Sequence, residues 1–179
     1  MSKFLKTISL DGNGGSYHSF NKDYHLVNKA TKVIIVGTIT SPKGRDKGFY
    51  YMSPSNPMYR ILDAYFKDTN FVKYKKEGNI PAIIDELKIK GIAFLDVIES
   101  CSNPKNSSLD NDLEDIKLDY EAFKDIDEKI VMIANSRNAY QALLRIKEKN
   151  GFNNEVKYVY GFRFYKQEDW NKVFKEIGL

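Results

Sequence analysis

The sequence predicts an α/β fold, and specifically a three-layer α/β/α sandwich around a short four-stranded parallel sheet. Four short apolar runs rich in β-branched residues are bounded by turn residues, which is typical of strands buried on both faces. Segments with helical spacing separate these runs, which is typical of parallel β-α-β units with right-handed crossovers. The four expected strands cover residues 32–37, 92–98, 129–134 and 155–160.

Capping residues and apolar periodicity predict the helices between the strands. Asn56 and Pro57 open a helix that runs to about residue 67, because asparagine is a good N-cap and proline suits the first helical position. The other helices are expected to start at Asn79, near Ser108 or Leu109, at Ser136 and near Gln167.

The length of 179 residues fits one domain, and no internal repeat or linker divides the chain. Residues 1–31 are polar with a glycine-rich turn, so we expect them to form a loosely ordered N-terminal arm packed on the domain. The α/β/α domain itself is expected to cover residues 32–179.

Cysteine and histidine usage excludes several kinds of site. The single cysteine, Cys101, rules out an internal disulfide and any four-cysteine zinc or iron–sulfur site, and it suits a reducing compartment. His18 and His25 lack acidic or cysteine neighbours at ligand spacing, so we expect neither a metal nor a cofactor. No apolar run is long enough to span a bilayer, and the sequence therefore predicts a cytoplasmic protein, which we expect to be a monomer.

The net charge of +4 is too small to indicate nucleic-acid binding by itself, but the placement of the cations is informative. The expected loop 38–55 carries Lys43, Arg45 and Lys47, followed by an aromatic run at 49–51. Cations beside aromatic rings suit a phosphate backbone and an unstacked base. The alternative is a solvated loop whose aromatic residues anchor it to the core. A second group of lysines, at 73–76, is expected in another loop.

Ligands of such sheets bind beyond the carboxyl ends of the strands, which directs attention to the loops there. Asp96 lies near the end of the second expected strand, and Glu99 follows three residues later. A carboxylate in an apolar strand is costly to bury unless it is paired or functional, and it can accept hydrogen bonds from a ligand. The alternative is a capping or salt-bridging acid.

The other loops at this edge also carry candidate binding groups. Asn135 and Ser136 present an amide side chain together with a helix N-terminus, which can serve an anion or a base but is also ordinary capping. The loop 161–166 mixes aromatic residues with cations, among them Arg163.

Three stretches of the chain together resemble the uracil-DNA glycosylase superfamily, most closely its hypoxanthine-DNA glycosylase-like branch. The strongest is VIIVGTITSPKGRDKGFYYMSPSNPMYRIL at 33–62, where a buried strand and a glycine turn precede paired tyrosines, an asparagine and Ile-Leu. The second is GIAFLDVIESCSNPKNSSLDNDL at 91–113, and a weaker third is IVMIANSRNAYQAL at 130–143. The resemblance implies a domain that flips a base out of DNA and hydrolyses its N-glycosidic bond.

The resemblance also assigns roles to individual residues. Tyr50 and Tyr51 are implied to be stacking groups or pocket walls, Asp96 to read the base, and Asn56 to be a site residue as well as a helix cap. Thr38 and Ile39 follow the glycine turn and are expected to line the base site.

Two positions depart from the family pattern. Ile39 stands where uracil-specific families have an acid or amide that orients water. The segment 161–164 replaces the Ser/Pro or His/Pro segment that grips DNA. Asp96 or Glu99 could assist the water instead, and Ser136 or Arg163 could stabilise an anionic leaving base.

Three functions therefore remain open: an active DNA glycosylase for a deaminated or modified base, an inactive relative that binds DNA or a nucleotide, and an unrelated small-molecule enzyme on the same scaffold. Lys43, Arg45, Lys47 and Arg163 are the expected DNA contacts. The first two functions require a pocket that admits an extruded base, with tyrosines above and Asp96 below.

Overall fold

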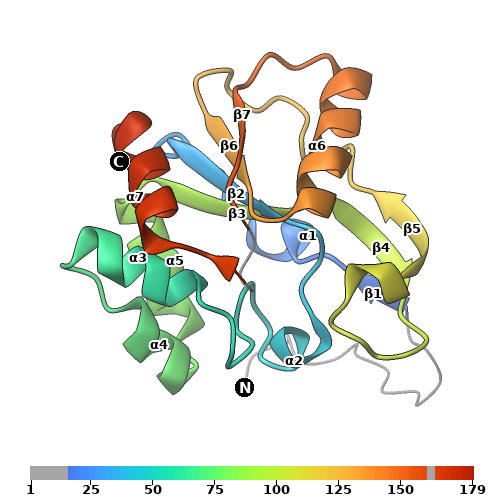
Figure 1. Cartoon of the computed structure of the whole chain (residues 1–179), viewed down its shortest axis with the longest axis horizontal. Helices are drawn as coiled ribbons and strands as arrows, with labels where there is room; N and C mark the ends of the chain where they lie inside the picture. Colours follow the sequence, from blue (N-terminus) through green and yellow to red (C-terminus); the bar gives the residue numbers. More distant parts are fainter. Residues whose placement is uncertain (1–15, 161–163) are drawn as a thin grey trace.

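The computed structural model describes residues 16–160 and 164–179, and its centre is a four-stranded parallel sheet (Figure 1). The strand order is β3-β2-β6-β7, with every neighbouring pair parallel. The predicted sheet is thus confirmed. Its strands are β2 (Val33–Gly37), β3 (Ile92–Asp96), β6 (Val131–Ala134) and β7 (Val156–Tyr158).

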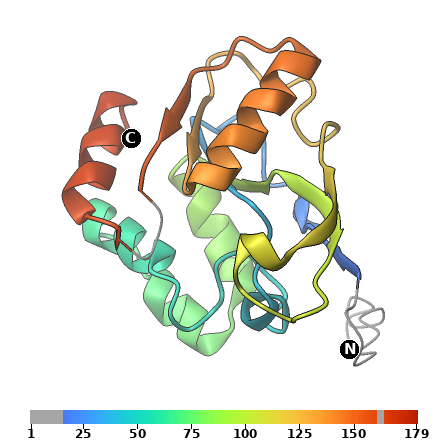
Figure 2. The same ribbon diagram turned by 45° about the vertical axis from the view of Figure 1, so that its right-hand side comes forward.

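Helices cover both faces of this sheet, which confirms the three-layer sandwich. In Figures 1 and 2, α3 (Met58–Phe66), α5 (Ile80–Ile89) and α7 (Gln167–Glu176) lie on one side and α6 (Arg137–Asn150) on the other. The strands β2 and β3 are buried along their whole length, because helices exclude water from both faces.

The direction of the connections places a switch point at the centre of the sheet. From β2 the chain crosses to β3 at one edge, whereas from β6 it crosses to β7 at the other edge. The connections that leave the neighbouring parallel strands β2 and β6 therefore run toward opposite edges of the sheet. The carboxyl ends of these two strands flank the position where open α/β sheets bind ligands.

Two of the predicted caps form, at Asn79 and Ser136, whereas the N-cap residue of α3 is Pro57 rather than Asn56. The Asn79 side chain accepts a hydrogen bond from the Ala82 amide at the start of α5. Ser136 Oγ accepts from the Ala139 amide at 3.0 Å, so α6 begins directly after β6. Such caps satisfy amide groups that have no partner in the first helical turn.

A second sheet lies beside the first, and the sequence did not predict it. It has the order β1-β4-β5, with antiparallel pairing between β1 (Ser16–His18), β4 (Ile98–Ser102) and β5 (Glu114–Leu118). The prediction of a polar loop at 99–107 and a helix from Ser108 or Leu109 is therefore wrong. Only the short helix η2 (Asp110–Asp112) forms there. The strand β5 is almost entirely exposed, so it lacks the alternation of apolar and polar residues that identifies a strand.

Two short helices also occupy segments that were expected to be loops. The lysines at 73–76 lie on α4 (Phe71–Glu77), which Phe71 anchors in the core, and α2 (Pro42–Arg45) interrupts the segment after β2. Residues 16–31 include α1 (Asn21–Tyr24) as well as β1, so this part of the chain is packed rather than loosely ordered. Within the described residues, no helix combines the length and the apolar character needed to cross a membrane.

Candidate functional site

Three polar side chains meet at Gly37, the last residue of β2. A Cβ atom at this position would lie 2.8 Å from Asp96 Oδ1, 3.1 Å from Tyr51 Oη and 3.7 Å from Asn135 Nδ2. The first of these distances is too short for a real Cβ contact, so the close approach requires glycine here. The strand ends and the loop after β2 thus converge at the switch point of the sheet.

Asp96 ends β3 directly beside Gly37 in the sheet register and is 2 % exposed. Its Oδ2 accepts hydrogen bonds from the Thr40 amide at 3.0 Å and from Thr40 Oγ1 at 3.2 Å, whereas Oδ1 faces Gly37. Burial raises the pKa of the Asp96 carboxyl to about 7, against the lowering influence of the Thr40 hydrogen bonds and the Arg45 charge. The group therefore changes charge near neutral pH.

Tyr51 and Asn135 complete the junction. The Asn135 side chain donates from Nδ2 to Tyr51 Oη at 2.8 Å, and both residues are buried. Burial raises the pKa of Tyr51 well above its usual value, so the phenol keeps its proton. Tyr51 has a φ of 56°, a left-handed conformation that costs a non-glycine residue about 1–2 kcal/mol. Strain of this kind clusters at functional sites.

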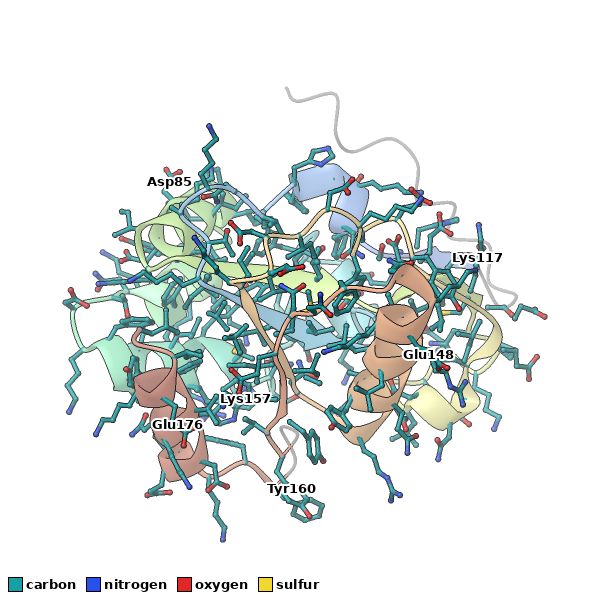
Figure 3. All side chains as sticks on the ribbon, turned by 90° about the horizontal axis from the view of Figure 1, so that it is seen from above. Asp85, Lys117, Glu148, Lys157, Tyr160 and Glu176 are labelled. Atoms are coloured by element: carbon teal, nitrogen blue, oxygen red, sulfur yellow. The ribbon has the colours of Figure 1, made fainter. Side chains whose placement is uncertain are left out.

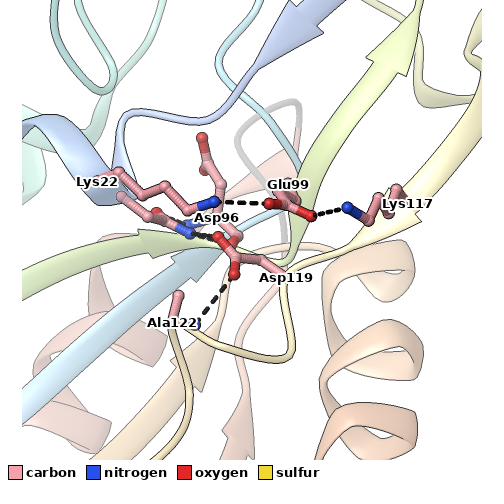
Figure 4. A network of polar contacts seen from close by, with 7 residues as sticks. Lys22, Asp96, Glu99, Lys117, Asp119 and Ala122 are labelled. Atoms are coloured by element: carbon pink, nitrogen blue, oxygen red, sulfur yellow. Dashed lines mark hydrogen bonds and ion pairs between the residues drawn. The ribbon is translucent and has the colours of Figure 1, made fainter.

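Asn21, from the N-terminal segment, fixes the position of Asp96 from behind. Its Nδ2 donates to the Asp96 carbonyl at 2.8 Å and to Asp119 Oδ2 at 2.9 Å. Its Oδ1 accepts from the Asp96 amide at 2.9 Å and from Tyr50 Oη at 2.8 Å. Figure 4 shows Asp119 beside Asp96 in this network. No motif in the sequence marks Asn21 as a site residue. Only its place between Phe20 and Tyr24, in a segment with apolar anchors, could have indicated that it is buried.

The segment around η2 lies against the same end of the sheet. Thr38 donates from Oγ1 to Asp110 Oδ1 at 2.9 Å, and Asn138 on α6 donates to Asp110 Oδ2 at 3.1 Å. Thr38 is half-buried, and Ser136 is likewise half-buried at the start of α6. Asp110 therefore links the loop after β2 to the helix after β6, and the N-terminus of α6 lies at the candidate site.

Tyr50 belongs to the core rather than to an open surface. It is 1 % exposed, its hydroxyl is bonded to Asn21, and its carbonyl accepts from Tyr59 Oη at 2.7 Å. Its ring also contacts Phe94 edge to face. In this conformation Tyr50 supports Tyr51 and Asn21 and offers no face to a ligand.

Glu99 and Asn56 are not brought to the Gly37 junction. Glu99 lies on β4, where its two oxygens pair at 2.7 Å with Lys22 and Lys117, and these partners hold its pKa near 2 (Figure 4). Asn56 Oδ1 accepts from the Met58 amide at 3.0 Å, so its side chain caps the start of α3. Of the candidate catalytic residues Asp96, Glu99 and Asn56, only Asp96 is seen at Gly37 among the described side chains nearest to it.

The four expected DNA contacts are placed differently from one another. Lys43 and Lys47 are exposed on and beside α2, after the carboxyl end of β2. Arg45 is directed inward: it donates from Nη1 to the His18 carbonyl at 2.6 Å and lies over the Tyr17 ring at 4.7 Å. Arg163 lies outside the described residues, together with residues 161–162.

The hollow at this edge is too small for a base. Ile39 is half-buried and lines it with Thr40, Cys101 and residues of the η2 segment, its volume is about 20 Å³, and the side chains that meet at Gly37 are not among its lining residues. That space holds about one water molecule, so a base can enter only if the surrounding segments move. A larger hollow of about 780 Å³ lies elsewhere, between β5, the segment 119–128 and the end of α6. In residues 16–160 and 164–179 no three acidic, histidine or cysteine side chains group as metal ligands.

The comparisons with known proteins bear on the fold. No protein-family model and no curated protein matches the chain. Among solved structures, a protein of Methanosarcina acetivorans, described as a candidate uracil DNA glycosylase, has a TM-score of 0.61 and 21% sequence identity. The match covers 93% of this chain and 98% of that protein. The two chains share their fold over nearly the whole length.

Proposed function

We propose that this chain is a DNA glycosylase-like protein that holds an extruded, deaminated base at Gly37 and hydrolyses its N-glycosidic bond. The observation that carries the proposal is the meeting of Asp96, Tyr51 and Asn135 at Gly37. The shared fold with a protein described as a candidate uracil DNA glycosylase supports it. The sequence resemblance favours the hypoxanthine-DNA glycosylase-like branch and leaves the base open.

Asp96 fits the edge of a deaminated base when its carboxyl is protonated. Deamination replaces an exocyclic amino group of the base by a carbonyl. A protein group that recognises the deaminated base must therefore donate a hydrogen bond at this position, where it would accept one from the undamaged base. Thr40 supplies two donors to Oδ2, which leaves the proton on Oδ1, the oxygen that faces Gly37. With a pKa of about 7, the carboxyl is largely protonated in slightly acid solution.

The same hydrogen bond would assist cleavage. In hydrolysis the water oxygen bonds to C1′, the C1′–N bond breaks with its electron pair on the base, and a water proton finally neutralises the base. Negative charge develops on the base carbonyl during this step, and a preorganised donor at that oxygen stabilises it. The N-terminus of α6, beside Asn135 and Ser136, adds a favourable dipole.

A panel of labelled oligonucleotides tests the function. Uracil, hypoxanthine and xanthine are each placed in single-stranded and duplex DNA, and strand scission after alkali reports excised bases. Cleavage of at least one substrate is expected. A protein that binds these oligonucleotides without cleaving any of them would be the inactive DNA-binding relative, which Ile39 at the water-orienting position favours.

Asn56 provides a separate test, because its capping role and its proposed role in the site can be separated. N56D keeps an oxygen that can accept from the Met58 amide, and aspartate caps helices as well as asparagine does. We therefore expect an unchanged melting temperature, but cleavage reduced by about ten-fold or more if the amide N–H₂ contacts substrate after the site opens. Equal cleavage by N56D and the wild type would leave Asn56 as a cap only.

A further inference from the structure

Three tyrosines, the half-buried Tyr140 and the exposed Tyr158 and Tyr160, form a row at the edge of the four-stranded sheet. The ring centroids of Tyr140 and Tyr158 are 5.6 Å apart, as are those of Tyr158 and Tyr160, with interplanar angles of 37° and 45°. Tyr158 is 37% exposed and Tyr160 is 63% exposed. Figure 3 shows Tyr160 projecting from the surface between the helices that carry Glu148 and Glu176.

Two tyrosines of the row lie at and just beyond the end of the edge strand β7, which ends at Tyr158. Val159, between the two exposed tyrosines, is 3 % exposed and anchors the chain in the core, so Tyr158 and Tyr160 face the same way. In the described part of the chain, no hydrogen bond engages the hydroxyl of any of the three tyrosines. Tyr140 packs against the core, but internal packing does not explain why the rings of Tyr158 and Tyr160 are exposed beside it.

The row starts beside the candidate site. Tyr158 is paired with Ala134 in the sheet register, and Ala134 directly precedes Asn135. Tyr140 lies in the first turns of α6, one turn after Arg137, which is exposed and forms no ion pair with another described residue. A cation and a run of exposed rings thus continue the site along the edge of the sheet.

We propose that the row of Tyr140, Tyr158 and Tyr160 binds unstacked bases of single-stranded DNA that flank the base held at Gly37. Exposed aromatic rings bind the faces of successive bases with little regard to sequence, and these faces are accessible only where the strand is unpaired. Arg137 lies where it can contact a phosphate of the same strand. This inference rests on the proposed function for its choice of ligand, and it adds a preference for single strands.

The test is direct binding of undamaged DNA, measured by fluorescence anisotropy. A labelled 12-nucleotide single strand and its duplex are titrated with the wild type, Y158A, Y160A, the double alanine variant and the double variant Y158F/Y160F. We expect each alanine variant to bind the single strand about ten-fold more weakly, because one stacking partner is lost. The phenylalanine variant keeps the rings and should bind within about two-fold of the wild type.

Two controls make the result specific. Ile89 is 75% exposed at the far end of α5, so I89A should leave binding unchanged and exclude general apolar adhesion. R137Q should reduce the slope of log affinity against log salt by about 0.7 for a single strand. Equal binding of single strand and duplex, or unchanged binding by the double alanine variant, would overturn the proposal.

The outcomes for the two proposals are distinguishable. The binding assay uses DNA without a damaged base and needs no cleavage. If the wild type cleaves no substrate but binds single strands through the tyrosines, only the proposed glycosylase activity fails. If it cleaves a deaminated base and the alanine variants bind normally, only the tyrosine row fails.

Discussion

Replacing Asp96 by leucine is expected to reduce excision of the deaminated base by about 10²–10³-fold at pH 6, the usual loss when one donor to a developing oxyanion is removed. Leucine has a similar size but offers no donor at the position of Oδ1. D96N is the matched variant, because its amide donates from the same place and its carbonyl still accepts from Thr40. D96N should keep activity within about ten-fold of the wild type.

The pH dependence tests the same role independently. Wild-type excision should fall as the pH rises through about 7, because the Asp96 carboxyl then loses the proton that it donates. D96N carries no such proton and should show no decline in this range. Single-turnover rates between pH 5.5 and 8.5 would measure both. A wild-type rate that rises through pH 7, together with an inactive D96N, would instead assign ionised Asp96 to the activation of water.

Glu99 is the second carboxylate that the sequence predicts could assist the water, so its replacement can be compared with that of Asp96. Its oxygens are occupied by Lys22 and Lys117, and it lies on β4 rather than at the Gly37 junction. E99Q should therefore cleave within about two-fold of the wild type, well short of the loss expected when a group in the reaction is removed. A large loss with an unchanged melting temperature would return Glu99 to the site.

The stability of the fold is expected to depend on pH through Asp96, and this dependence should be absent in D96N. The pKa of Asp96 is about 7 in the folded chain against an ordinary 3.8, so the folded state holds a proton that the unfolded state has released between these values. The free energy of unfolding therefore falls as pH rises from about 4 to 7, by on the order of 4 kcal/mol for this group. Above pH 7 the full cost of the buried charge is present.

D96N removes this cost because asparagine is neutral at every pH. We expect D96N to match the wild type near pH 4 and to exceed its unfolding free energy at pH 8 by up to on the order of 4 kcal/mol. Urea denaturation at pH 4, 6 and 8 measures the difference, and subtracting the two curves cancels the other titrating groups. Parallel curves would mean that the carboxyl titrates as an exposed group does.

The sequence predicted the main sheet because each of its strands carries its own signal. β2 and β3 are continuous apolar runs, and α5 and α6 begin at side-chain caps that can be recognised locally. The second sheet carried no such signal, since β5 is exposed and its pairing with β4 depends on neighbours that the chain brings together only on folding. The same holds for α4, which begins without a side-chain cap and has seven residues.

The site was predictable to the extent that strand ends determine it. Asp96 and Asn135 were expected at the carboxyl edge because parallel strands end together there. Thr40 and Asn21 contact Asp96 although they are 56 and 75 residues away from it in the sequence. Local sequence patterns do not predict contacts between residues that are so far apart in the chain. The burial of Tyr50 was not predicted for a related reason. The local sequence of a loop does not indicate whether a tyrosine hydroxyl faces water or, as here, bonds to the distant Asn21.

The hydrogen bonds of Asn21 have a consequence for where the folding unit begins. A fragment that starts at residue 32 would keep all four parallel strands and yet leave the Asp96 amide and carbonyl, the Tyr50 hydroxyl and one Asp119 oxygen without the partner that Asn21 provides. Each polar group stranded in this way costs about 1–3 kcal/mol, and together these costs rival the whole stability of an ordinary domain. The smallest autonomous unit thus includes the helical turn at 21–24, whose Asn21 holds the backbone of Asp96 in place.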